Sequence, residues 1–86
     1  MSQQEIQIVL QHIFVSNFNI GASKFSWDVP LEQLDEDFKT LSFLIFLEQL
    51  VNTEFKIRAS ILEQINVSVH TPSDINNLIL RNLQLI

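Results

Sequence analysis

Residues 36–57 read EDFKTLSFLIFLEQLVNTEFKI, and this stretch decides the fold because a long apolar helix can be read from it. An acidic pair opens the stretch, and apolar side chains occupy most positions from Phe38 to Val51. Acidic groups suit the positive end of a helix dipole, and Asp37 has the short polar side chain that N-cap positions favour. We therefore predict a helix over residues 38–52, capped by Asp37, with apolar side chains around most of its circumference.

The start of the chain predicts a first helix. Ser2 and Glu5 are spaced as in a capping box, where each side chain accepts a hydrogen bond from the backbone N–H of the other residue. Apolar residues then recur at helical spacing, namely Ile6, Val9, Leu10 and Ile13. We place this helix at residues 3–16.

The end of the chain predicts one short and one longer helix. Thr71 and Pro72 are residue types favoured at an N-cap and at the first helical position, respectively. Apolar residues continue from there at helical spacing, which predicts a helix over residues 72–83. A shorter apolar cluster predicts a short helix over residues 59–65.

Residues 17–35 form a long connection between the first two predicted helices. Pro30 blocks a helix through the residue before it, and Gly21 permits a left-handed turn. The many apolar residues of this connection indicate that it packs back onto the helices, with a helical turn at residues 31–34. No strand-like alternation persists, so we predict an all-α fold: a small four-helix bundle in a single domain, residues 1–86, with a long first loop and a short third helix.

Composition narrows the classes of function. The 86 residues carry a net charge of −5, and the five basic residues are scattered, so we expect no nucleic-acid binding. The acidic character suits a partner with a basic docking surface. Two histidines far apart in sequence and the absence of cysteine indicate no metal site. No nucleophile–base pattern is present, so we expect no enzymatic activity.

The same features lead to expectations about location. The N-terminal residues show no basic region followed by an apolar run, as a signal peptide would. The apolar runs are far shorter than a bilayer span requires, and the absence of cysteine is compatible with a reducing compartment. We expect a cytoplasmic, monomeric protein without a membrane span.

The order and spacing of these elements resemble the acyl carrier and peptidyl carrier protein family. The resemblance covers nearly the whole chain and is strongest over residues 36–55. There the family's buried positions on the second helix are taken by Leu41, Phe43, Leu44, Leu47 and Val51. The resemblance implies a carrier fold and partner enzymes, from a lipid, polyketide or nonribosomal peptide pathway, that dock on the second helix.

The residue that defines carrier function in this family is missing. An Asp-Ser-Leu triplet starts the family's second helix, and its serine carries phosphopantetheine; the matching triplet here is Glu36-Asp37-Phe38. A carboxylate at Asp37 cannot carry a stable phosphodiester, so the resemblance implies a degenerate member without this cofactor. Ser42 is the nearest alternative attachment site, more than one turn inside the predicted helix.

Three functions remain open from the sequence. The first is a carrier-like protein that acts by docking, with the contact made by the predicted second helix through Phe38, Lys39, Ser42, Ile45, Phe46 and Gln49. The second is a working carrier with phosphopantetheine on Ser42. The third is a helical protein-interaction adaptor with no link to acyl chemistry.

Overall fold

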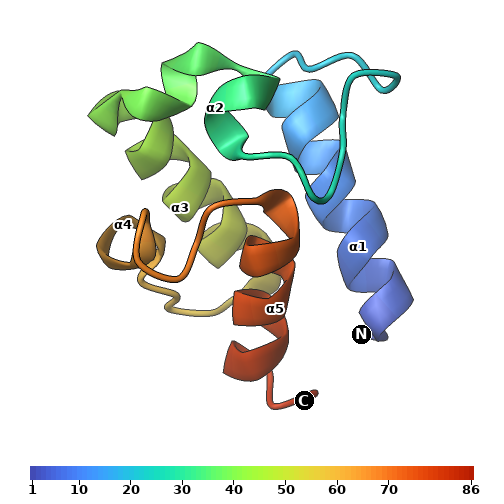
Figure 1. The fold of residues 1–86 in the computed structure, drawn as a ribbon. Coiled ribbons are helices and arrows are strands. Elements are labelled where there is room, and N and C mark those ends of the chain that lie inside the picture. The colour runs from blue at the N-terminus through green and yellow to red at the C-terminus, as the bar shows by residue number, and fades with distance from the viewer.

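The computed structural model describes residues 1–86 and consists of helices and connecting loops, without a strand (Figure 1). In chain order the elements are α1 (Gln3–His12), the π-helical turn η1 (Ile13–Asn17), α2 (Leu31–Leu34), the 3-10 turn η2 (Glu36–Lys39), α3 (Leu41–Phe55), α4 (Ile61–Gln64) and α5 (Pro72–Asn82). The predicted all-α class is confirmed. None of the helices combines the length and the apolar character that crossing a membrane requires.

The first helix begins as the sequence predicts. The Ser2 hydroxyl accepts from the Glu5 backbone N–H at 3.2 Å, and the Glu5 carboxylate accepts from the Ser2 N–H at 3.2 Å. The regular α-helix ends at His12, and the chain continues to Asn17 as a π-helical turn. The predicted range of 3–16 therefore covers two kinds of helix, since local apolar spacing does not distinguish them.

The central helix begins later than predicted, at Leu41 rather than at residue 38. Thr40 has an extended backbone (ψ 145°) and separates α3 from the 3-10 turn η2. Its N–H and its hydroxyl both donate to the Asp37 carbonyl, at 2.9 and 2.6 Å. At the other end α3 continues past residue 52 to Phe55, where Lys56 adopts the left-handed conformation (φ 55°) that ends many helices.

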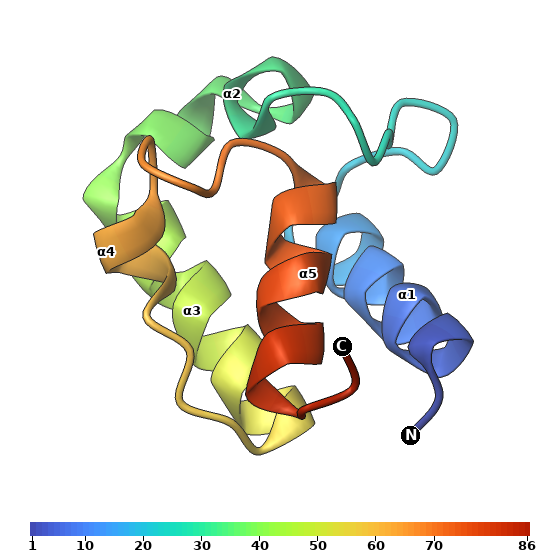
Figure 2. The same cartoon turned by 60° about the horizontal axis from the view of Figure 1, so that its bottom comes forward.

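Three longer helices enclose the core. In both views α5 lies between α3 and α1 (Figures 1 and 2). Their facing sides supply most of the side chains that are entirely shielded from solvent, and α4 adds Ile61: Ile6, Leu10 and Phe14 come from α1 and η1, Leu47 and Val51 from α3, and Ile75 and Ile79 from α5. Burying an aliphatic side chain of this size contributes about 1.5–3 kcal/mol, so these contacts account for the helix arrangement.

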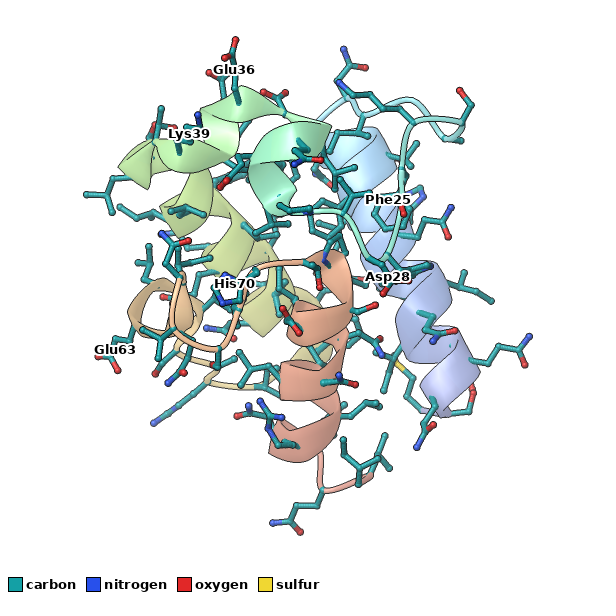
Figure 3. All side chains as sticks on the ribbon, viewed as in Figure 1. Phe25, Asp28, Glu36, Lys39, Glu63 and His70 are labelled. Atoms are coloured by element: carbon teal, nitrogen blue, oxygen red, sulfur yellow. The ribbon has the colours of Figure 1, made fainter.

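The long first loop packs against this core, as its apolar composition predicts. Phe18 and Ile20 are buried, and Phe25 and Trp27 are half-buried against the core. The loop also bonds to the start of α5, because the Trp27 carbonyl accepts from the Ser73 N–H at 2.9 Å. Figure 3 shows Phe25 on this loop beside α1.

The start of α5 carries a second capping box with a charged member. Asp74 accepts from the backbone N–H groups of His70 and Thr71, at 2.9 and 3.1 Å, and the Thr71 hydroxyl accepts from the Asp74 N–H at 3.2 Å. Partial burial by itself would raise the pKa of the Asp74 carboxyl. The hydrogen bonds from His70 and Thr71 more than offset burial and lower this pKa below its ordinary value.

Replacing Asp74 by alanine is expected to lower the free energy of unfolding by about 1 kcal/mol at neutral pH. A carboxyl whose pKa is lower in the folded state stabilises the fold above its ordinary pKa of about 4, and this contribution is lost as the pH falls through the folded-state value. Urea unfolding of wild type and Asp74→Ala should therefore converge at acid pH. The control is Glu63→Gln, on an exposed residue, and a difference for Asp74→Ala that does not change with pH would contradict the assignment.

Candidate functional site

The acidic triplet before α3 is arranged differently from the prediction. The Asp35 carboxylate, not that of Asp37, accepts the capping hydrogen bond, from the Asp37 backbone N–H at 2.9 Å. The prediction that Asp37 caps the central helix is therefore wrong. The reason is the break at Thr40: acidic residues ahead of an apolar run suit the start of a 3-10 turn as well as that of an α-helix. The Asp37 side chain is exposed to solvent.

Phe38 does not belong to a docking surface. Only 4% of this residue is exposed, and its ring centroid lies 4.9 Å from that of Phe18 and 5.8 Å from that of Phe14. The 3-10 turn directs this side chain into the aromatic part of the core. The prediction of Phe38 as a docking residue is wrong for this reason.

The first turn of α3 reverses two further expectations. Leu41, assigned to a buried position, is the first residue of the helix and is 65% exposed. Ser42, expected more than one turn inside the helix, is its second residue and is exposed. Because α3 starts at Leu41, the first hydroxyl within the central helix belongs to Ser42, whereas the hydroxyl of the preceding Thr40 donates to the Asp37 carbonyl.

The exposed side of α3 forms an apolar surface, which we call the α3 face: Leu41, Ser42, Ile45, Phe46 and Gln49. Leu41, Ile45 and Gln49 follow one another at helical i, i+4 spacing, and Ser42 and Phe46 form the adjacent row. Ile45 is 38% and Phe46 43% exposed. The face contains no charged side chain, and the next exposed residues toward the C-terminus of α3 are Thr53 and Glu54.

Charged residues lie at the N-terminal end of this face. Glu36, Asp37 and Lys39 are exposed on η2. Figure 3 shows Glu36 directed away from the body of the molecule, with Lys39 near the start of α3. The predicted docking residues other than Phe38, namely Lys39, Ser42, Ile45, Phe46 and Gln49, are all exposed and lie on or next to the α3 face.

The structure has one cavity, of about 390 Å³, beside η2. It is lined by three segments: Pro30, Leu31 and Glu32 of α2 and the residue before it, Phe38, Lys39 and Leu44 of η2 and α3, and Ile65, Asn66, Val69 and His70 of the α4–α5 loop. The Leu31 N–H donates to the His70 carbonyl at 2.9 Å and joins two of these segments. No local sequence pattern indicates such a cavity, because its walls meet only in the folded chain.

Neither histidine lies in a cluster of potential metal ligands. No three His, Cys, Asp or Glu side chains lie together as ligands of a metal ion would. His12 and His70 are both exposed. The His12 Nδ1 atom lies 3.4 Å from the Ser16 hydroxyl on the outer side of the first helix, away from the cavity lining.

A comparison of the chain with protein-family models, curated proteins and solved structures finds no match. The function therefore has to be inferred from the α3 face, the first turn of α3 and the cavity.

Proposed function

We propose that this chain is a carrier-like docking domain that binds a partner protein through the α3 face. The observation that carries the proposal is the two-sided character of α3. Leu44, Leu47 and Val51 are buried in the core, while Leu41, Ile45 and Phe46 are exposed on the other side. Apolar groups gathered on one helix side mark an interaction surface more often than single exposed residues do.

The chemical character of the α3 face and of the residues around it indicates what the partner surface must look like. An uncharged apolar helix side fits an apolar groove, in the manner of helix-in-groove recognition. The exposed carboxylates of Glu36 and Asp37 and the net charge of −5 favour basic residues at one end of that groove. The partner is therefore a protein with an apolar groove that has a basic rim.

The carrier-like part of the proposal rests on the order of the elements. A long first loop, a long central helix, a short α4 and a capped last helix follow the plan of acyl and peptidyl carriers. On this basis the partners are enzymes of a lipid, polyketide or nonribosomal peptide pathway. Asp37 carries no phosphopantetheine in this proposal.

The position of Ser42 favours a second candidate, a working carrier modified at this serine. Its hydroxyl is exposed in the first turn of α3, where the backbone is more accessible than in the helix interior. The chain would be incubated with coenzyme A and a broad-specificity phosphopantetheinyl transferase, and its intact mass measured. A gain of one phosphopantetheine that is lost in Ser42→Ala supports the working carrier; an unchanged mass supports docking alone.

A photo-crosslinking residue placed at Ile45 tests the docking proposal directly. Crosslinked proteins would be identified by mass spectrometry, with the same residue at exposed Val67 as the control. Enzymes of acyl or peptidyl pathways captured only from position 45 support the proposal. Captured proteins without such activities support the adaptor instead, and identical capture from both positions contradicts a specific face.

Replacing Ile45 by aspartate is expected to weaken binding of a partner found in this way by at least about 1 kcal/mol, because a carboxylate would be desolvated in an apolar contact. The fold should survive, since Ile45 is 38% exposed. Isothermal titration measures the affinity, and circular dichroism checks the helices. Val67→Asp introduces the same charge away from α3 and should leave the affinity unchanged; equal losses in both variants would point to a general charge effect.

A further inference from the structure

The cavity beside η2 carries two opposite charges that do not neutralise each other. Glu32 comes from α2 and Lys39 from η2, and both side chains are exposed at the cavity. No carboxylate lies within 4.0 Å of the Lys39 ammonium, and no basic group lies within this distance of Glu32. Each charge is therefore free to pair with a ligand group of the opposite sign.

Four of the residues that line the cavity are apolar and buried, and they form its base: Leu31, Phe38, Leu44 and Val69 are each at most 8% exposed. The volume of about 390 Å³ is within the range of small-molecule sites, so it suits a compact ligand.

The α4–α5 loop, which lines one side of the cavity, is held in place by its own hydrogen bonds. In the α4–α5 loop, which runs alongside α2 in Figure 2, the backbone N–H groups of Val67, Ser68 and Val69 all donate to the Gln64 carbonyl, at 3.0 Å. The Asn66 N–H donates to the Val69 carbonyl at 3.1 Å. The wall is thus formed before any ligand binds, and binding needs little reordering of the chain.

We propose that this cavity binds a free α-amino acid with a compact apolar side chain. Its carboxylate pairs with Lys39, its ammonium group pairs with Glu32, and its side chain covers the apolar base. A plain carboxylic acid would leave Glu32 facing another negative charge, and an amine would leave Lys39 facing a positive one. A zwitterion has no net charge, so the acidic character of the chain does not repel it. The cavity shares no residue with the α3 face itself, but Lys39, which lies at the N-terminal end of that face, also lines the cavity.

Titrations of the ¹⁵N-labelled chain with four small molecules test the proposal. L-leucine has both charges and the apolar side chain, 4-methylpentanoate lacks the ammonium group, 3-methylbutylamine lacks the carboxylate, and glycine lacks the side chain. We expect L-leucine to shift the amide signals of Val69 and His70 with a millimolar Kd. Exposed ion pairs are weak, so each missing charge should raise the Kd by roughly threefold to fivefold. Glycine should bind more weakly than L-leucine.

Two charge variants with matched controls locate the contacts. Glu32→Gln should remove the preference for L-leucine over 4-methylpentanoate, and Lys39→Gln should remove the preference over 3-methylbutylamine. The controls are Glu63→Gln, on a residue that points outward from α4 (Figure 3), and Lys24→Gln in the first loop; both should behave as wild type. The proposal is overturned if L-leucine shifts no cavity signal up to about 20 mM, well above a millimolar Kd, if either single-charge analogue binds as tightly, or if the controls reproduce the effects.

Discussion

Replacing Phe38 by alanine is expected to remove most of the stability of this chain. The residue is 4% exposed, and its ring contacts those of Phe14, Phe18 and Phe43 at centroid distances of 5.8, 4.9 and 5.5 Å. Truncating a buried phenylalanine to alanine costs about 3–5 kcal/mol, because both the transfer energy and the packing around the cavity are lost. A domain of this size has a total stability of only about 5 kcal/mol. Urea unfolding followed by circular dichroism should show a partly or wholly unfolded variant.

Phe46→Ala is the matched control for this result. Phe46 also contacts Phe18, with ring centroids 5.4 Å apart, but it is 43% exposed on the α3 face. Since much of its area already lies in water, its truncation should cost roughly 1–2 kcal/mol and leave a cooperative transition. Equal losses for both variants would mean that Phe46 is structural and that the α3 face is smaller than proposed.

The burial of Phe38 could not be predicted from the sequence, whereas Phe46 was expected on the docking surface and is exposed there. Phe38 and Phe46 lie in one apolar stretch, and the side that Phe38 occupies depends on where the helix begins. A 3-10 turn up to Lys39, an extended Thr40 and a new helix from Leu41 change the direction of the side chains before Leu41 relative to one continuous helix. The acidic residues did not indicate the 3-10 turn, because they favour the start of a 3-10 turn and of an α-helix alike.

Features fixed by neighbouring residues were predicted well. The predicted capping box of Ser2 with Glu5 is present, and Thr71 and Pro72 start α5 as predicted, since both features need only residues close together in the chain. The packing of the first loop was predicted from its apolar residues alone. Exposure of Ile45 on α3 was expected as part of the docking prediction, and the structure agrees.

Features that join distant segments were missed. The cavity forms where α2, η2 and the α4–α5 loop meet, and the sequence of none of these segments predicts a cavity by itself. The contact between α3 and α4 depends on polar side chains in an apolar helix. The Glu48 carboxylate accepts from the Leu62 N–H in the first turn of α4, at 2.9 Å. From the sequence alone, Glu48 and Asn52 are polar residues of an apolar helix, and their polarity predicts exposure to solvent rather than contact with another segment.

Asn52→Ala is therefore expected to destabilise the chain far more than its polar, helical position suggests. The Asn52 side chain donates to the Ala59 carbonyl at 3.1 Å and accepts from the Ala59 N–H at 2.9 Å. Ala59 is 4% exposed, so the variant leaves both of these backbone groups without a partner. A buried group that loses its hydrogen bond costs about 1–3 kcal/mol, which gives about 2–6 kcal/mol for the pair. Urea unfolding gives the free energy directly.

Two further variants separate this hydrogen-bonding role from helix propensity and from size. Thr53→Ala, on the exposed neighbour, makes a similar truncation on the same helix and should change stability by less than about 0.5 kcal/mol. Asn52→Asp keeps the acceptor for the Ala59 N–H but places a carboxylate against the Ala59 carbonyl, so its loss should depend on pH and diminish as the carboxyl is protonated. If Asn52→Ala costs no more than Thr53→Ala, water replaces the lost amide at Ala59, and the attachment of the loop before α4 does not depend on this side chain.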